Sequence, residues 1–219
     1  TDLGGEAFSP VAIIGESCGE FLVTHGDAPY DTIPELIEYT KAHPGEVRMA
    51  ANTGATSYYA AIKLSEQGAD LNIVNSGSSS ERVAALLGDQ INLSVNAYGV
   101  IGQYIETGDL KILGCLATER SETYADVPTA VDQGVDLSYD LIYNLLAPKG
   151  TDPAIIEKMS EACQKIIEED SGYAEAIATS YGEKPLAVRI YSHRTKFINS
   201  EISVASSHSP LTIKHSSLA

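Results

Sequence analysis

Basic residues are scarce in this sequence. Its 219 residues include 14 Lys and Arg against 30 Asp and Glu, which gives a formal net charge of -16 at pH 7. Proteins that bind nucleic acids or anionic membranes present a basic surface, so we expect no nucleic-acid partner. An anionic ligand would have to be held by local groups, against the overall negative charge of the chain.

Long apolar runs and regularly spaced cysteines are also lacking. No run reaches the roughly 18 apolar residues of a transmembrane helix, and the opening residues TDLGG have neither the basic nor the apolar block of a signal peptide. Because the chain does not start with Met, we expect a processed product or a fragment. Cys18, Cys115 and Cys163 are odd in number and widely spaced, which argues against a disulfide framework or a cysteine zinc site. The histidines are scattered, so we expect no metal and no cofactor.

Motifs for several kinds of chemistry are missing. Neither G-x-x-x-x-G-K-[ST] nor G-x-G-x-x-G occurs, which argues against a phosphate loop and a dinucleotide site. His25 and His43 fall in loop-like segments without an evident Ser or Asp partner, which disfavours a hydrolase triad. Cys18 and Cys115 could act as the acid and base of a cofactor-independent racemase. The simpler interpretation is that each cysteine is a small buried hydrophobic residue.

Strand and helix patterns alternate along most of the chain. Apolar runs predict strands at 11–14, 21–23, 47–51, 71–74, 91–95 and 110–116. Helices are expected at 33–42, 58–67, 81–87 and 98–106, and a strongly amphipathic helix opens at Asp152 and Pro153. Strands that alternate with helices of this length predict an α/β fold with a parallel-rich sheet.

Hydroxyl groups gather where two predicted strands meet the following helices. Asn52-Thr53-Gly54-Ala55-Thr56-Ser57 follows the strand at 47–51, and a serine-rich turn follows the strand at 71–74. Ligands of open α/β sheets bind outside the carboxyl ends of the strands, where helix N-termini act as partial positive charges. Hydroxyl donors added there can hold a carboxylate without Lys or Arg. The alternative for each turn is a helix cap, and Ser78 and Glu81 have the spacing of a capping box.

The last 32 residues differ in composition from the rest. From Val188 onward the chain has four Lys or Arg, one acidic residue, eight serines and three of the five histidines. No strand or helix period continues beyond Ile202. We expect 188–219 to be a poorly ordered or atypical tail, foreign to the parent fold.

Seven segments of the chain occur together in an order that points to one family. They are FSPVAIIGES, the stretch from Pro34 to Gly45, NTGATSYY, VAALLGDQINL, the stretch from Ile105 to Leu113, DVPT and NLLAPKGTDPAIIEKM. The order resembles that of the substrate-binding proteins of tripartite tricarboxylate transporters, the Bug-type receptors. The likeness covers about residues 6–187.

The resemblance implies a periplasmic-binding-protein-like fold of type II, in which two lobes close on a small carboxylate. Such a receptor is not an enzyme, and it delivers its ligand to the membrane permease subunits of the transporter. It would work as a monomer in the periplasm or anchored at the cell surface. Lobe one would combine 1–21 with 144–187, and lobe two would be 22–143. Lobe one is expected to be incomplete, because the first βαβ portion of the family has no match here.

The resemblance also implies that three turns supply the ligand contacts, with no catalytic residue and no metal ligand. The implied contacts are Asn52, Thr53, Gly54, Thr56, Ser57, Asn75, Ser76, Gly77, Ser78, Ser79, Asn96 and Ala97. Glu20, near the predicted hinge, favours a ligand that carries an amino group. Two alternatives stay open: a cysteine-dependent racemase or lyase, and the ligand-sensing domain of a regulatory system.

Overall fold

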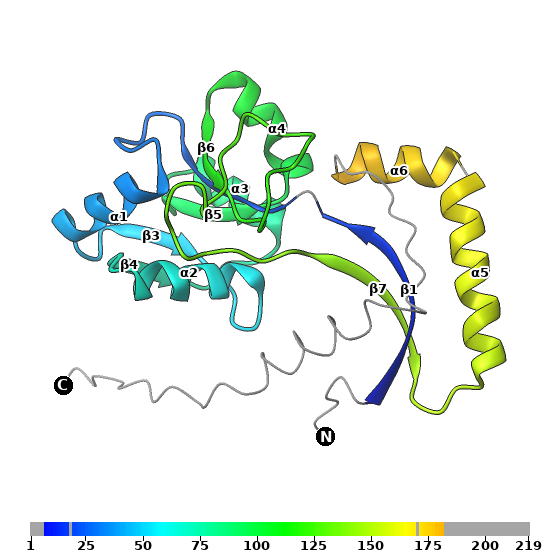
Figure 1. Cartoon of the computed structure of the whole chain (residues 1–219). Coiled ribbons are helices and arrows are strands. Elements are labelled where there is room, and N and C mark those ends of the chain that lie inside the picture. The colour runs from blue at the N-terminus through cyan, green and yellow to red at the C-terminus, as the bar shows by residue number, and fades with distance from the viewer. Residues whose placement is uncertain (1–6, 18, 170, 182–219) are drawn as a thin grey trace. The chain divides into compact units, whose positions relative to one another are not determined.

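The computed structural model describes residues 7–17, 19–169 and 171–181, so the predicted tail at 188–219 lies outside the described residues (Figure 1). The elements in chain order are β1 (Phe8–Glu16), β2 (Phe21–His25), α1 (Ile33–Ala42), β3 (Val47–Ala50), α2 (Thr56–Glu66), β4 (Leu71–Val74), α3 (Ser79–Leu87), β5 (Leu93–Asn96), α4 (Tyr98–Thr107), β6 (Leu110–Cys115), β7 (Ile142–Pro148), α5 (Pro153–Glu169) and α6 (Ser171–Tyr181). The predicted strands and helices up to β6 are confirmed, with bounds that shift by at most three residues.

Two compact units divide the chain. The larger unit is built from Gly15–Tyr143 together with α6, and the smaller unit contains the chain before Gly15 and the segment Asn144–Glu169. The larger unit contains the whole of 22–143, the range assigned to lobe two from the sequence. The role of that range as the ligand-binding lobe stays a prediction.

The larger unit contains a five-stranded sheet of order β4-β3-β5-β2-β6. Strand β3 runs parallel to β4 and β5, as the alternating pattern predicts, whereas β2 is antiparallel to both β5 and β6. Phe21, the first residue of β2, therefore pairs with Asn96 and Cys115, the last residues of β5 and β6. The residue just before β2, Glu20, consequently lies at the edge where the parallel strands end.

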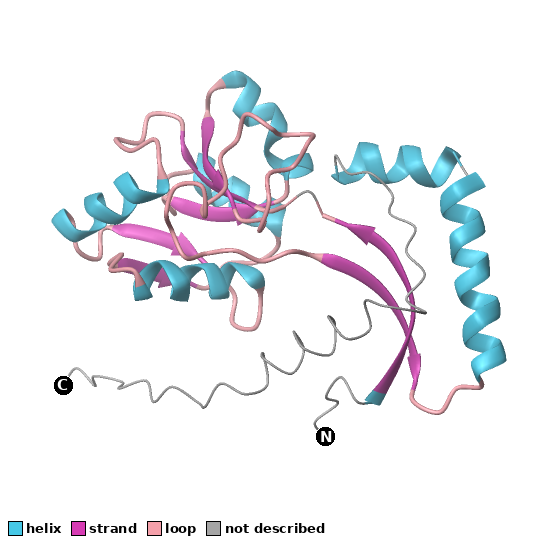
Figure 2. Cartoon of the chain, in the orientation of Figure 1, coloured by secondary structure: helices cyan, strands magenta, loops and turns pink. Residues whose placement is uncertain are grey.

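Apolar side chains on the two faces of this sheet pack against different helices. On one face Leu22 packs with Leu36 of α1 and Leu64 of α2, and on the other Phe21 packs with Leu86 of α3. Phe21 and Leu22 point to opposite faces because successive strand residues alternate. Burying one such side chain stabilises the fold by about 1.5–3 kcal/mol, so the helices are held firmly against the sheet (Figure 2).

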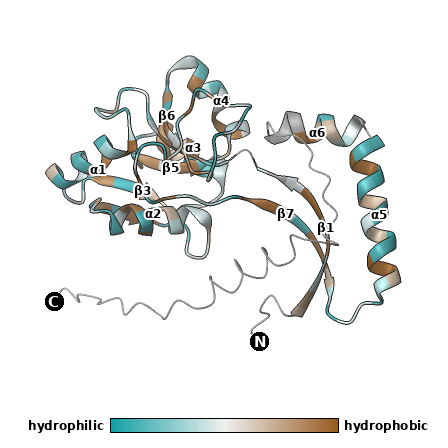
Figure 3. Cartoon of the chain, in the orientation of Figure 1, coloured by the Kyte–Doolittle hydropathy of each residue, from teal (hydrophilic) through white to brown (hydrophobic). Residues whose placement is uncertain are grey.

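The smaller unit contains α5 and most of a two-stranded sheet formed by β1 and β7. Strand β7 was not predicted, and its carboxyl end runs into Pro148 and Gly150, residues that are typical of turns. Helix α5 begins at Pro153 as predicted, and Ile156 is its buried apolar anchor. Ile155 and Met159 of this amphipathic helix are 53% and 40% exposed. Figure 3 shows several brown, hydrophobic segments along α5.

None of the helices among the described residues combines the length and the apolar character that a bilayer span requires. Within the same ranges, no group of three or more His, Cys, Asp and Glu side chains could hold a metal ion.

Candidate ligand-binding site

Three loops leave the sheet of the larger unit at a single edge. They follow β3, β4 and β5, which run in the same direction, so all three carboxyl ends meet there. Helix α2 leads from β3 to β4 on one side, whereas α4 leads from β5 past β2 to β6 on the other side, so the connections diverge between β3 and β5. Such a switch point is where open α/β sheets bind their ligands. The twelve residues implied by the resemblance all belong to these loops or to the strand and helix ends beside them.

Asn52 joins the first loop to the second. Its Nδ2 donates to the carbonyl oxygen of Gly77 at 3.0 Å, and its Oδ1 accepts from the backbone N–H of Ser76 at 3.1 Å. The backbone N–H of Asn52 donates to the hydroxyl of Ser57, which is only 2% exposed. Asn52 and Ser57 therefore hold the two loops in place, and this network fixes where the neighbouring hydroxyls lie.

The second loop caps helix α3, which is the alternative that the spacing of Ser78 and Glu81 predicts. Ser78 is the N-cap of α3: its hydroxyl accepts from the backbone N–H of Glu81, and the Glu81 carboxylate accepts from the backbone N–H of Ser78. Hydrogen bonding from Ser78 to this carboxylate, chiefly from the backbone N–H of Ser78, lowers the pKa of Glu81. The N-terminus of α3 is thus satisfied by the chain itself. Asn75 beside this loop is exposed.

The first loop differs, because its hydroxyls do not cap a helix. The N-cap of α2 is Ala55, and no side chain among the described residues caps this helix. Thr53 and Gly54 are exposed, and Gly54 has a φ of 83°, a left-handed conformation that glycine adopts without strain. The first N–H groups of a helix have no partner within the helix, so the start of α2 can bind an anion.

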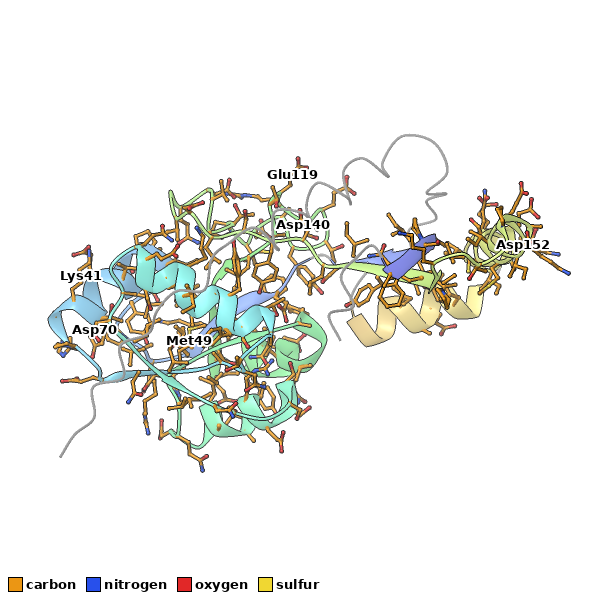
Figure 4. All side chains as sticks on the ribbon, turned by 90° about the horizontal axis from the view of Figure 1, so that it is seen from below. Lys41, Met49, Asp70, Glu119, Asp140 and Asp152 are labelled. Atoms are coloured by element: carbon orange, nitrogen blue, oxygen red, sulfur yellow. The ribbon has the colours of Figure 1, made fainter. Side chains whose placement is uncertain are left out.

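A carboxylate already lies beside this helix start, and it belongs to the chain. The Thr56 hydroxyl donates to Oε2 of Glu20 at 2.6 Å, and the Tyr139 hydroxyl donates to the same oxygen at 2.8 Å. Burial, followed by the neighbouring Glu20 carboxylate, raises the pKa of the Tyr139 phenol, which therefore stays protonated and able to donate. Two labels in Figure 4 help to find these residues: Asp140 directly follows Tyr139, and Met49 lies in β3, the strand that leads to the first loop.

Arg82 supplies a buried positive charge behind the second loop. It is 8% exposed, and its guanidinium donates to the carbonyl oxygens of Gly77 and Val95 and to the hydroxyl of Ser79. Burial lowers the pKa of Arg82, while the Glu20 carboxylate acts in the opposite direction. Its Nε is buried without a hydrogen-bond partner among the described residues. The loops themselves contain no Lys or Arg, and the structure adds this cation from α3.

The end of β5 contributes interior polar groups. Asn96 is fully buried, its Nδ2 donates to the Ser94 hydroxyl at 2.7 Å, and its Oδ1 has no partner among the described residues. Ala97 is the N-cap of α4, and no side chain in the described part of the chain caps that helix. A second helix therefore starts at this edge with its N–H groups uncapped.

Glu20, Arg82 and Tyr139 complete the site, and two of them were missed as site residues. The sequence analysis noted Glu20 for its charge but not as a contact of Thr56. Arg82 carries a sequence signal, a charged residue at a helix position that packs inward beside Val83. Tyr139 has none, because it reaches the site from the long loop between β6 and β7.

Cys115 does not have the properties of a catalytic base. It ends β6 and is 2% exposed, and burial raises the pKa of its thiol. A base needs a pKa near the working pH, so burial makes the thiolate less available. Its proposed counterpart, Cys18, lies outside the described residues.

Ser17 and His25 are not arranged as in a serine hydrolase. Residues 15–19 read Gly-Glu-Ser-Cys-Gly and fit the G-x-S-x-G pattern, but they run from the end of strand β1 toward strand β2, whereas a nucleophile turn joins a strand to a helix. His25 ends β2 rather than lying in a loop, and its Nε2 is 3.6 Å from the carboxylate of Asp89. Because Ser17 precedes β2 and His25 ends it, the length of that strand, about 13 Å, lies between them.

The comparison with solved structures defines the class of fold. Solved structures of periplasmic binding proteins share this α/β fold, among them MatC from Rhodopseudomonas palustris with bound malate. That structure is 22% identical in sequence, has a TM-score of 0.72, and is matched over 90% of this chain and 68% of that chain.

The chain belongs to the tripartite tricarboxylate transporter family receptors, whose family model matches residues 6–203. A protein from Cupriavidus necator described as "UPF0065 protein in gbd 5'region" is 31% identical over 77% of this chain and 51% of its own length. Protein BugT of Bordetella pertussis is 30% identical over 69% of this chain and 47% of its own length. The chain thus spans about half the length of the curated relatives it matches.

Proposed function

We propose that this chain is part of an extracytoplasmic receptor that binds a small carboxylate and delivers it to the permease subunits of a tripartite transporter. The observation that carries the proposal is the start of α2. Its first N–H groups have no side-chain cap among the described residues. Its first side chain, Thr56, donates to a carboxylate of the chain itself, that of Glu20. The related MatC structure contains malate, a small carboxylate.

In the proposed site, the uncapped N–H groups of α2 and the hydroxyl of Thr53 bind the ligand carboxylate, while the hydroxyl of Thr56 donates to Glu20. The N–H groups at the start of α4, beside Ala97, face the same edge of the sheet. Asn52 keeps the loops at a fixed separation, and Arg82 adds positive charge behind them. Hydrogen bonds to a charged acceptor contribute about 1.5–3 kcal/mol each, so a few of them suffice against the overall charge of -16.

The larger unit is the proposed ligand-binding lobe, and the smaller unit together with further chain would form the other lobe. We infer that the receptor acts as a monomer on the outer side of the cytoplasmic membrane. No catalytic step is assigned to it, in agreement with its membership of a receptor family.

Thermal unfolding of the full 219-residue chain against a panel of monocarboxylates, dicarboxylates, tricarboxylates and amino acids tests the proposal. A ligand at 100 times its dissociation constant stabilises the folded chain by about 2.7 kcal/mol, which raises the unfolding midpoint by several degrees. Neutral amides of the same acids are the control and should give no shift. A folded chain that no acid of the panel stabilises would contradict the proposed function.

A further inference from the structure

We propose that the ligand carries a protonated amine beside its carboxylate, and that Glu20 recognises this amine. The inference rests on the proposed function and names the class of ligand within it. Its basis is the position of Glu20. The carboxylate of this residue lies inside a site whose other groups are arranged to bind the carboxylate of a ligand.

The position of Glu20 follows from the antiparallel direction of β2. Because β2 runs against β5 and β6, its amino end meets their carboxyl ends, and Glu20 lies directly before Phe21. The side chain is partly buried and reaches the start of α2 through Thr56. A parallel strand at this position in the sheet would have put the same residue at the opposite edge.

The hydrogen bonds of Glu20 leave one oxygen able to accept. Thr56 and Tyr139 both donate to Oε2, and among the described residues no donor to Oε1 is found. The carboxylate is thus fixed in orientation by two neutral hydroxyls, while Oε1 retains its lone pairs for another donor. An ammonium group has three donors and a full positive charge, so it fits this oxygen in both respects.

The charges of the site also favour an amine. Arg82 is the buried cation that interacts electrostatically with Glu20, and its guanidinium donates to Gly77, Ser79 and Val95 rather than to that carboxylate. Glu20 and Arg82 together are neutral. A ligand carboxylate alone would add an uncompensated negative charge beside Glu20, whereas a ligand that is a zwitterion keeps the site neutral.

A different role for Glu20 makes a distinct prediction. If its carboxylate only fills the ligand position while the site is empty, every carboxylate has to displace it, with or without an amine. Replacing Glu20 would then strengthen the binding of all acids by the same factor. The amine hypothesis predicts instead that the replacement changes the preference between two acids that differ only in the amine.

Isothermal titration of the full chain with paired ligands separates these possibilities. Each amino acid of a panel is paired with the des-amino acid of the same carbon skeleton, such as L-aspartate with succinate and L-glutamate with glutarate. We expect at least one amino acid to bind about tenfold more tightly than its partner, the size of one charge-assisted hydrogen bond. In Glu20→Gln, this ratio should fall below about threefold, while the des-amino acid binds as well as before or better.

Controls make the result specific to the carboxylate of Glu20. Glu106→Gln removes the same charge from an exposed residue in the last turn of α4, at the other edge of the sheet, and should leave the ratio unchanged. Glu20→Asp keeps the charge and should retain part of the preference. Unfolding midpoints of all variants show whether each one is folded.

The outcomes distinguish failure of this inference from failure of the proposed function. A chain that binds des-amino acids as tightly as amino acids, or a preference that Glu20→Gln leaves intact, overturns the role of Glu20 while carboxylate binding stands. An equal gain for both members of a pair in Glu20→Gln also overturns it. Absence of binding by every acid of the panel contradicts the proposed function and the inference together.

Discussion

The hydroxyl of Thr56 donates a hydrogen bond of 2.6 Å to the carboxylate of Glu20, which lies 36 positions earlier in the chain. Thr56 is the first residue of α2, a helix that no side chain of the described residues caps. The bond places an acidic group beside a helix start that lacks a side-chain cap. The proposed binding of a carboxylate and the proposed preference for an amine next to it both rest on this relationship.

Removal of the Thr56 hydroxyl should weaken the binding of an amino acid, because this hydroxyl holds Glu20 in place. Thr56→Val keeps the shape of the side chain but removes one of the two donors to the Glu20 carboxylate, and a hydrogen bond to a charged group contributes about 1.5–3 kcal/mol. The dissociation constant of the amino acid, measured by titration calorimetry, should therefore rise by up to about tenfold. Thr123→Val, in an exposed loop position, is the matched control. If Thr56→Val and the unaltered chain bind the ligand with equal affinity, Thr56 does not contribute to the site.

Arg82 should matter more for stability than an exposed arginine does. Arg82→Met leaves the hydroxyl of Ser79 and the carbonyl oxygen of Val95 without their guanidinium donor in a buried region. We expect a loss of about 2–4 kcal/mol in the free energy of unfolding, measured by urea titration. Arg120→Met breaks a half-exposed ion pair with Asp132 and should cost under about 1 kcal/mol. Similar losses in the two variants would contradict the buried role of Arg82.

The capping box of α3 should make stability depend on pH. The pKa of Glu81 is lowered from its ordinary value of 4.5 in the folded chain, because Ser78 donates to its ionised form. The contribution of Glu81 is therefore fully present above pH 4.5 and is lost as the pH falls through the lowered value. The difference in unfolding free energy between the unaltered chain and Glu81→Gln should shrink between pH 6 and pH 3. A difference that stays constant over this range contradicts the assignment.

The thiol of Cys115 should react slowly in the folded chain. Burial excludes reagents and raises its pKa, and the thiolate is the reactive form. Alkylation with iodoacetamide at pH 7.5, mapped by peptide mass spectrometry, should label Cys163 before Cys115, since Cys163 is partly exposed. The two rates should become similar in urea. Fast labelling of Cys115 without urea would contradict this expectation and would favour a cysteine-dependent activity.

Local sequence patterns were sufficient to predict most elements of the larger unit. The Ser78 and Glu81 spacing predicted the capping box of α3, because a capping box depends only on residues three apart, although the helix was expected from Glu81 and begins at Ser79. The start of α2 was predicted two residues late, at Tyr58 rather than Thr56, because its N-cap is an alanine and gives no signal. The direction of β2 was not predictable, since it depends on partners that lie at least 69 positions away in the chain.

The candidate site could be predicted only as far as its loops. Asn52, Thr56 and the serine turn are visible because they follow strands and precede helices. Tyr139 could not be predicted, because its hydrogen bond to Glu20 joins residues 119 positions apart in the chain. Arg82 was overlooked because its position within α3, rather than in a loop, suggested a surface charge.

The most direct test of the central claim is an NMR titration of the ¹⁵N-labelled chain with the tightest-binding acid of the panel. The account predicts that the backbone amides of Thr53, Thr56 and Ser57 show the largest shift changes, because the ligand carboxylate accepts from the start of α2. Largest changes at the opposite edge of the sheet, around His25 and Asp89, would contradict it.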